Sequence, residues 1–291
     1  MMNLLDGKLA AEAIKTALKL QVAERQAAGK KIPHLAAILV GNNGASATYV
    51  AAKVKACEQI GFISSLIRLD EGVSQHTLLE TIRSLNQDPD VDGILVQLPL
   101  PAHISEQEVI DTLDPNKDVD GFHPVNVGRM VLGASGFIPA TPLGIMLLLS
   151  HFRIDTKGMN AVVIGRSNIV GRPMSILLSA QSHPGNCTVT LCHSKTKDLI
   201  GHCRQADLVV AALGKPLFLT ADMVKEGAIV IDVGITRIND ASRKNGFRIL
   251  GDVDFESVAP RCSWITPVPG GVGPMTIAAL MKNTFLACSQ K

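Results

Sequence analysis

Short apolar runs separated by turns and amphipathic stretches recur along this chain. Most of the runs are continuous rather than alternating, which is typical of parallel strands buried on both faces of a sheet. Strands of this kind that alternate with helices predict an α/β fold with right-handed crossovers. The strands are expected at Leu35–Val40, Ile63–Leu69, Gly93–Gln97, Ala161–Gly165, Thr188–Cys192, Asp207–Ala212 and Ala228–Val233.

Amphipathic stretches between these runs predict helices, several of them with recognisable start signals. Ser74 is a predicted N-cap, and Ser105 followed by Glu108 has the spacing of a capping box. A glycine-rich turn precedes another helical stretch, and glycine ends a further one. The helices are expected at 46–60, 74–86, 105–113 and 170–181, with a last helix from about Thr276.

The segment 115–142 is rich in proline, glycine and aspartate and has weak periodicity. A long irregular segment inside a compact chain is usually functional, and here it also suggests a domain boundary. The length of 291 residues suits two domains of ordinary size. We predict one α/β domain over residues 1–140 and a second over 141–269, with 270–291 returning to the first.

Composition narrows the class of protein. Apolar residues make up 46% and charged residues 19%, which suits a soluble protein with a well-filled core. Aromatic residues make up 3%, too few for stacking on single-stranded nucleic acid. The net charge of +2 is too small for an electrostatic DNA surface, so no nucleic acid partner is expected. No apolar run is long enough to cross a membrane.

The N-terminal stretch lacks the basic start and apolar core of a signal peptide, so a cytoplasmic location is expected. The six cysteines agree, since none forms a CxxC pair. Cysteines and histidines do gather between 187 and 203, but their spacing matches no standard zinc pattern. Cys192 is expected to point from a strand into a core, and no metal is predicted.

The stretch Pro267–Pro274 holds three glycines and three prolines and leads directly into a helical run. Glycine allows a ligand to approach the backbone closely, and proline fixes the flanking turns. Such a loop before a helix N-terminus suits a flat or anionic ligand. The alternative is a structural turn between two domains.

Tyr49 and Lys53 stand four residues apart in the predicted helix that follows the first strand of the parallel sheet. That spacing places both side chains on one helix face, next to the apolar stripe of Val50, Val54 and Cys57. The helix begins at the carboxyl edge of the sheet, where open α/β sheets bind ligands. The alternative is a surface tyrosine beside a lysine that extends along the helix to solvent.

Two further segments carry polar side chains at turns. Gln97 ends a buried strand and precedes two prolines, and its amide can donate and accept at once. Lys117-Asp118-Val119-Asp120-Gly121 lacks the EF-hand pattern, and a buried aspartate that faces N–H donors of a heterocycle is the sharper interpretation. A strand end and an ordinary Asp-rich turn are the structural alternatives.

The segment 162–173 follows a strand and opens a helix, as a dinucleotide-binding turn does. It departs from GxGxxG because glycines stand only at Gly165 and Gly171. The next strand lacks the acid that would bind the ribose of NAD, and Ser194 and Lys195 follow it instead. With Arg166 nearby, this pattern favours the additional phosphate of NADP.

Taken together, these segments resemble the bifunctional methylenetetrahydrofolate dehydrogenase/cyclohydrolase family, of the bacterial type. The resemblance covers essentially the whole chain, and its ordered blocks are far more specific than any single motif. The blocks are TYVAAKVKA (48–56), GILVQLPLP (93–101), PNKDVDGFHPVNVGR (115–129), ATPLG (140–144), VVIGRSNIVGRP (162–173), CHSKT (192–196), ADLVVAALGKP (206–216), VIDVGI (230–235), GDVDF (251–255) and TPVPGGVGPMT (266–276).

The resemblance implies two α/β domains with parallel sheets, the second a Rossmann-like NADP-binding domain, and a folate cleft between them. It implies catalytic roles for Lys53, for Tyr49 against the folate rings, for Gln97 beside Lys53 and for Asp120 at the pterin edge. Further folate contacts are implied for Val96, Leu98, Pro269, Gly270, Gly271, Gly273, Pro274 and Thr276. NADP contacts are implied for Gly165, Arg166, Ser167, Ser194 and Ile235.

The implied chemistry is NADP-dependent oxidation of 5,10-methylenetetrahydrofolate to the 5,10-methenyl cation, followed by hydrolysis to 10-formyltetrahydrofolate. The family also implies a homodimer. Two rival functions are another two-domain NADP enzyme of the shikimate dehydrogenase type and a nucleotide-binding sensor without turnover. The first has no use for the PGGVGP loop, and the second has none for Tyr49, Lys53 and Asp120.

Overall fold

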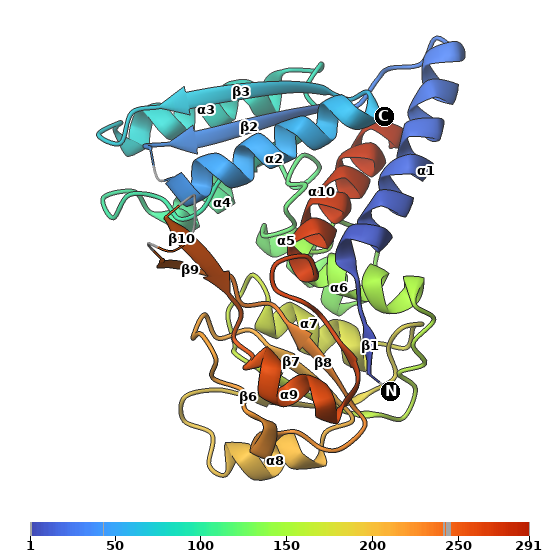
Figure 1. Ribbon diagram of the computed structural model, residues 1–291. Helices are drawn as coiled ribbons and strands as arrows, with labels where there is room; N and C mark the ends of the chain where they lie inside the picture. The colour runs from blue at the N-terminus through green and yellow to red at the C-terminus, as the bar shows by residue number, and fades with distance from the viewer. Residues whose placement is uncertain (1, 43, 241, 243–245, 291) are drawn as a thin grey trace. The chain divides into compact units, whose positions relative to one another are not determined.

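The structure is a computed structural model that describes residues 2–42, 44–240, 242 and 246–290. The chain forms two compact units (Figure 1). Unit 1 holds the N-terminal residues up to Ala11 together with Thr141–Thr276, and unit 2 holds Glu12–Ala140 together with the residues from Ile277 onward. The division into domains at 140/141 and 269/270 stays a prediction.

Unit 2 is built on a parallel sheet with the order β3-β2-β4. Helices α3 and α4 cover one apolar side of it, through Leu78 and Ile82 of α3 and Val109 of α4. After α4 the chain returns to the sheet, where Asp118 forms a parallel bridge with Ile94. The elements are β2 (His34–Val40), α2 (Gly44–Ile60), β3 (Ile63–Leu69), α3 (Gln75–Gln87), β4 (Gly93–Val96) and α4 (Glu106–Thr112).

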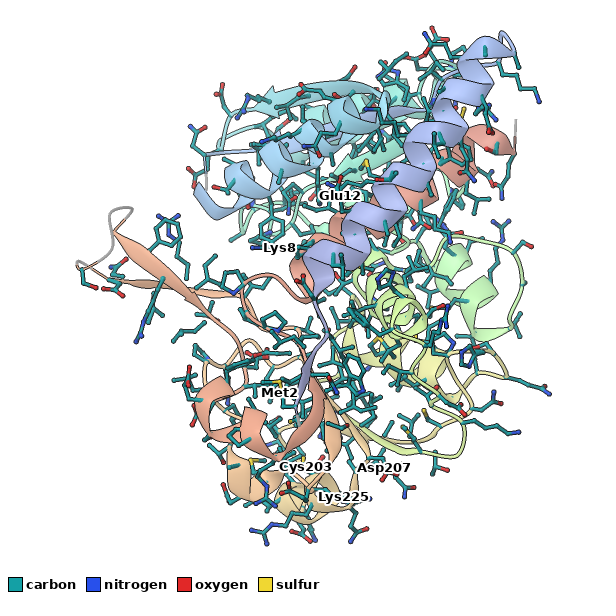
Figure 2. All side chains as sticks on the ribbon, turned by 45° about the vertical axis from the view of Figure 1, so that its right-hand side comes forward. Met2, Lys8, Glu12, Cys203, Asp207 and Lys225 are labelled. Atoms are coloured by element: carbon teal, nitrogen blue, oxygen red, sulfur yellow. The ribbon has the colours of Figure 1, made fainter. Side chains whose placement is uncertain are left out.

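Two long helices, α1 (Gly7–Ala27) and α10 (Val272–Ser289), begin in unit 1 and end in unit 2. They lie side by side in Figures 1 and 2. In unit 2 the Arg25 guanidinium donates to the Cys288 carbonyl at 3.4 Å and lies over the Phe285 ring. No described helix is both long and apolar enough to cross a bilayer.

Unit 1 is built on a six-stranded parallel sheet with the order β1-β11-β8-β7-β5-β6. Apolar residues of the central strands, with Leu219, Met223 and Val258 from the connections, fill one core. The strands are β1 (Asn3–Leu4), β5 (Asn160–Ile164), β6 (Thr188–Cys192), β7 (Leu208–Ala211), β8 (Ala228–Asp232) and β11 (Cys262–Ile265).

The connections of unit 1 carry short helices and a hairpin. The antiparallel hairpin β9–β10 projects from the body of the unit (Figure 1). The elements are α6 (Ala140–His151), α7 (Gly171–Ser179), α8 (Leu199–Gln205), the 3₁₀ helix η1 (Ala221–Met223), β9 (Thr236–Asn239), β10 (Phe247–Leu250), α9 (Phe255–Val258) and η2 (Ala259–Arg261).

The predicted α/β class and its parallel sheets are confirmed, and all seven predicted strands lie within one residue of the expected bounds. Ser74 and Ser105 are N-caps, as predicted. The sequence analysis missed β1, β11 and the β9–β10 hairpin. It was also wrong about 115–142, which contains the helix α5 (Pro124–Val131), and about the last helix, which begins at Val272 rather than Thr276.

Candidate active site

Lys53 is a buried lysine of unit 2. It lies on α2, and only 5% of the residue is exposed, whereas Lys55 on the same helix is exposed to solvent. The predicted apolar stripe is formed by Val50 and Cys57, which are completely buried, but Lys53 is more buried than Val54. A buried ammonium is costly unless it is paired. Lys53 is therefore not a lysine that extends to solvent.

Gln97 holds the Lys53 side chain. Lys53 Nζ donates to Gln97 Oε1 at 3.1 Å, and Gln97 Nε2 donates to the Leu98 carbonyl at 2.7 Å. The Gln97 backbone N–H donates to the Ile38 carbonyl at 2.9 Å, which fixes Gln97 at the carboxyl end of the central strand pair. The amide is thus oriented with its oxygen toward the lysine, and the two predicted residues do meet.

Asp120 and Lys53 influence each other's pKa through their charges. Burial lowers the pKa of Lys53, and the negative charge of Asp120 works against that shift. Burial raises the pKa of Asp120, and the positive charge of Lys53 works against it in turn. Desolvation therefore moves both groups toward their neutral forms, while their mutual attraction opposes that shift. Such opposed shifts in one place are typical of catalytic groups.

Tyr49 lies one helical turn before Lys53 and is half-buried. Burial raises the pKa of its phenol, so the hydroxyl stays protonated. Asp120 lines a small pocket together with the predicted residues Val96 and Leu98 and with Asp118 and Phe122. The structure thus gathers the unit 2 candidates at the carboxyl edge of its sheet.

Asp118, which the sequence analysis noted only as part of an acidic turn, organises the loop that carries Asp120. Its carboxylate accepts from the backbone N–H of His123 at 2.8 Å and from Asn126 Nδ2 at 3.0 Å. Burial raises the pKa of Asp118 to about 6 despite these donors. On the other flank Asn283 Nδ2 donates to the Val119 carbonyl at 2.8 Å. The sequence signal that could have revealed this role of Asp118 was its place as a second acid two positions before Asp120.

The predicted dinucleotide turn lies in unit 1, between β5 and α7. Gly165 has φ +118°, and a Cβ on Gly171 would overlap the Gly165 carbonyl oxygen. This close crossing explains two glycines six residues apart. Ser167 Oγ accepts from the N–H groups of Val170 at 3.2 Å and Gly171 at 3.3 Å, which closes the turn onto the helix.

The other cofactor candidates follow further strand ends at the same edge of the sheet. Arg166 after β5, Ser194 after β6 and Ile235 after β8 are all exposed. The turn that carries Ser194 is closed by the His193 N–H, which donates to Thr196 Oγ1 at 2.8 Å. Because the carboxyl ends of parallel strands share one edge, these side chains border one surface. That edge is where dinucleotides bind in open α/β sheets.

The glycine–proline segment also belongs to unit 1. Gly271 N–H donates to the Pro267 carbonyl at 2.8 Å, and Gly270 has φ +116°. Since α10 begins at Val272, the segment is a tight loop followed by the first turns of a helix, and Thr276 Oγ1 lies 3.0 Å from Thr141 Oγ1. Pro269 is exposed, Gly270 and Gly271 are buried, and Gly273, Pro274 and Thr276 are half-buried.

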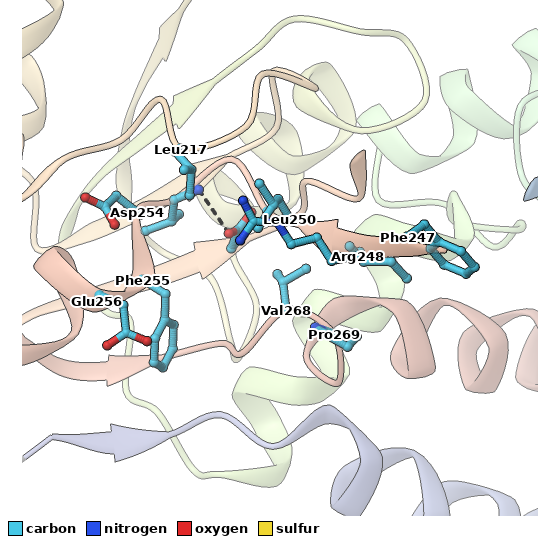
Figure 3. A pocket seen from close by; sticks show the side chains of 13 residues that line it. Leu217, Phe247, Arg248, Leu250, Asp254, Phe255, Glu256, Val268 and Pro269 are labelled. Carbon is cyan, nitrogen blue, oxygen red and sulfur yellow. Dashed lines mark hydrogen bonds between the residues drawn. The ribbon is translucent and has the colours of Figure 1, made fainter. Parts of the chain in front are cut away.

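A pocket of about 610 Å³ opens beside this loop within unit 1. Among the predicted substrate residues, Pro269 lines it. Figure 3 shows Asp254 and Glu256 on one side of the pocket and Arg248 and Phe247 toward the other. Both signs of charge therefore border the pocket, and the sequence analysis did not anticipate it.

Two family models match the chain over nearly its whole length. Residues 5–120 match the tetrahydrofolate dehydrogenase/cyclohydrolase catalytic domain, and residues 139–291 match the tetrahydrofolate dehydrogenase/cyclohydrolase NAD(P)-binding domain. The chain belongs to this family. The resemblance predicted from the ordered sequence blocks is confirmed, and the shikimate-type dehydrogenase is ruled out as its family.

Individual relatives agree with this assignment. The bifunctional protein FolD of Bacteroides fragilis is 61% identical over 286 residues, which are 98% of each chain. The FolD structure from Campylobacter jejuni covers 100% of this chain and 99% of its own, with 51% identity and a TM-score of 0.93. The Trypanosoma brucei enzyme, solved with NADP cofactor and inhibitor, covers 99% and 98%, with 37% identity and a TM-score of 0.93.

Proposed function

We propose that the chain is a bifunctional enzyme that oxidises 5,10-methylenetetrahydrofolate with NADP⁺ and hydrolyses the resulting 5,10-methenyl cation to 10-formyltetrahydrofolate. The single observation that carries the chemistry is the buried Lys53 with its amine on Gln97 Oε1 at 3.1 Å and Asp120 facing it. These groups supply an amine of lowered pKa, an amide that orients it and a carboxylate of raised pKa.

The hydrolytic step assigns each of these groups a task. Water attack forms a C–O bond at the one-carbon bridge and releases one proton. Ring opening then breaks the bond to N5, which keeps the electron pair and takes up a proton, while the hydroxyl proton leaves as the formyl group forms on N10. Lys53 Nζ accepts the proton that the water loses, because burial favours its neutral amine. A neutral amine also avoids placing a second positive charge beside the cationic substrate.

Asp120 is proposed to bind the pterin edge, since a carboxylate accepts from adjacent N–H donors. Tyr49 is proposed to pack against the folate rings. Val96, Leu98 and the Pro269–Thr276 segment complete the proposed folate contacts. The predicted domains, residues 1–140 with 270–291 for folate and 141–269 for NADP, belong to this proposal.

The carboxyl edge of the unit 1 sheet fits NADP. Its glycine turn brings backbone close to a ligand without side chains in the way, and Gly165 and Gly171 cannot carry a Cβ there without strain or overlap. Arg166, Ser167, Ser194 and Ile235 would hold the cofactor. When bound, NADP⁺ supplies the acceptor for the hydride of the one-carbon bridge.

We also propose that the protein is a cytoplasmic homodimer that binds no nucleic acid. The family resemblance supports the dimer, and the net charge of +2 argues against a nucleic acid partner. All six cysteines are buried free thiols, which suits a reducing compartment.

One spectrophotometric experiment tests both activities. NADPH formation from 5,10-methylenetetrahydrofolate reports the dehydrogenase, and the decay of added 5,10-methenyltetrahydrofolate without NADP⁺ reports the cyclohydrolase. The same assay with NAD⁺ in place of NADP⁺ measures the cofactor preference. An enzyme that forms NADPH but leaves the methenyl compound at its uncatalysed rate would contradict the bifunctional proposal. A protein that binds NADP⁺ without turnover would support the sensor instead.

A further inference from the structure

Asp252, between β10 and α9, is a completely buried aspartate outside the groups discussed so far. Its Oδ2 accepts from the backbone N–H of Leu213 at 2.6 Å and of Gly214 at 2.9 Å. Both donors belong to the loop that follows β7 at the carboxyl edge of the unit 1 sheet. One carboxylate oxygen thus fixes two successive backbone groups of that loop.

The same loop adjoins the dinucleotide turn. Ala212 N–H donates to the Ile164 carbonyl at 2.8 Å. A Cβ on Gly165 would overlap the Ala212 carbonyl oxygen, so the loop backbone lies directly against the glycine of the turn. Contact therefore runs from Asp252 through Leu213 and Ala212 to Gly165.

Asp232, at the end of β8, extends this linkage to the next loop. Its Oδ1 accepts from the N–H groups of Gly234 at 2.9 Å and Asp252 at 2.8 Å. Its own N–H donates to Thr266 Oγ1 at 2.7 Å. Gly234 immediately precedes the cofactor candidate Ile235, so the two aspartates tie together the loops after β7 and β8.

Two glycines make room for the two carboxylates. A Cβ on Gly234 would overlap the backbone N and Oδ1 of Asp252, and a Cβ on Gly251 would overlap the Asp232 carboxylate. Asp252 Oδ1 is buried and has no hydrogen-bond partner among the described residues. A buried carboxylate oxygen without a partner costs stability. The two bonds that Oδ2 accepts from the loop therefore indicate a role for Asp252 other than stabilising the fold.

A backbone ladder holds the segment that carries Asp252. Leu217 N–H donates to the Gly251 carbonyl at 3.0 Å. Leu219 N–H donates to the Asp252 carbonyl at 2.9 Å, and Asp254 N–H returns to the Leu219 carbonyl at 2.9 Å. Because this ladder fixes the backbone without the Asp252 side chain, the carboxylate is free to act on the loop rather than on the fold.

We propose that Asp252 is a positioning residue for the dinucleotide: it holds the loop 212–214 against the glycine turn, with Asp232 as its support. The proposal rests on the proposed function, in which this edge binds NADP. Asp252 belongs to unit 1 and the groups around Lys53 belong to unit 2, so we expect Asp252 to act on cofactor binding.

The test uses the full-length protein and two readouts. The first is the NADP⁺ dissociation constant from titration, and the second is the cyclohydrolase kcat/KM measured without NADP⁺. Asp252→Ala leaves two backbone N–H groups unpaired, so we expect NADP⁺ to bind about 10- to 100-fold more weakly. Cyclohydrolase kcat/KM should stay within about threefold, since Asp252 shares no hydrogen-bond partner with the groups around Lys53, which belong to the other unit.

Two further variants keep the result clear if Asp252→Ala does not fold. Asp252→Asn keeps an acceptor oxygen for Leu213 and Gly214, so NADP⁺ affinity should stay within about threefold of wild type, as for a neutral acceptor in the same place. Gly234→Ala displaces the same carboxylate from the opposite side. It should therefore reproduce the selective loss of NADP⁺ affinity seen with Asp252→Ala.

Asp207→Asn is the matched control. Asp207 also accepts a backbone N–H, from Asn160 at 2.9 Å, but it lies before β7, at the opposite edge of the same sheet, and pairs with Lys225 (Figure 2). Both readouts should stay at the wild-type value for this variant.

Three outcomes would overturn the inference. Wild-type NADP⁺ affinity in folded Asp252→Ala would remove the positioning role, as would unchanged affinity in Gly234→Ala. Equal loss of both readouts would make Asp252 a residue of the fold only. A wild-type protein that does not bind NADP⁺ would overturn the proposed function itself, and it is recognised before any variant is measured.

Discussion

The two candidate regions, one in each unit, are built in opposite ways. Around Lys53 in unit 2, charged groups are buried, and desolvation shifts their pKa values toward neutrality. At the carboxyl edge of the unit 1 sheet, the candidate side chains Arg166, Ser194 and Ile235 are exposed, and the close approach is made by glycine backbone.

This difference follows from what each region has to do. A proton-transfer group needs a pKa near the working pH, and burial supplies that shift at a cost in stability. A cofactor-binding edge needs shape and hydrogen-bonding groups, since the cofactor brings its own chemistry. Substitutions in the first region should therefore act on the hydrolytic rate and on folate affinity, and substitutions in the second should act on cofactor affinity.

Replacement of Lys53 should have the largest effect. Lys53→Met removes the amine but keeps an unbranched side chain, so the fold and folate binding should survive. Loss of one positioned proton-transfer group costs about 10²–10⁴-fold, and cyclohydrolase kcat should fall by that factor. The decay of 5,10-methenyltetrahydrofolate measures it.

Lys55→Met is the matched control, because Lys55 lies on the same helix and is exposed. Its cyclohydrolase rate should equal that of the wild type. A Lys53→Met protein that hydrolyses the substrate at the parental rate would remove Lys53 from the mechanism.

Asp120→Ala should weaken folate affinity and leave NADP⁺ affinity nearly intact. Loss of the carboxylate would leave the pterin N–H donors that it is proposed to bind unpaired in a half-buried site, which costs about 1–3 kcal/mol. That corresponds to an approximately 5- to 150-fold rise in the folate dissociation constant. Titration of both ligands measures it, with exposed Asp111→Ala as the control. An equal loss of NADP⁺ affinity would make Asp120 a structural residue of its turn.

The same contrast explains what the sequence could predict. Parallel strands buried on both faces leave continuous apolar runs, so all seven central strands were found within a residue. The two-residue strand β1 leaves no such pattern, because its register with Trp264 and Ile265 depends on residues some 260 positions away. The hairpin β9–β10 is only partly buried, so its apolar signal is weak.

Site residues were predictable where a local motif carried them. Gly165 and Gly171 flank the turn between β5 and α7, and the glycine spacing shows their role. Asp252 was missed because its partners, Leu213 and Gly214, lie nearly forty residues earlier in the chain, and a lone buried acid has no local pattern. The burial of Lys53 beyond that of Val54 was equally a tertiary property.

Arg166→Ala tests the exposed region. The guanidinium is expected to pair with the 2′-phosphate of NADP⁺, and an exposed charge-assisted contact of this kind changes affinity by about tenfold. The ratio of kcat/KM for NADP⁺ to that for NAD⁺ should favour NADP⁺ in the wild type and fall by this factor in the variant. Arg172→Ala is the control, since exposed Arg172 bonds Asn168 Oδ1 at 3.0 Å instead. A wild-type preference for NAD⁺ would contradict the assignment.

Asp120→Asn should have the smallest effect, a shift in a pH profile. The negative charge of Asp120 raises the pKa of Lys53, while burial lowers it. The neutral amide removes the raising contribution, so the pKa of Lys53 falls further. If the neutral amine accepts the proton of water, cyclohydrolase kcat rises with pH through this pKa, and the midpoint moves to lower pH in the variant. Measurement of kcat at saturating substrate across pH, for wild type and Asp120→Asn, decides it. A rate that falls with rising pH would make Lys53 a cationic hydrogen-bond donor, and an unmoved midpoint would show that Asp120 does not set its charge.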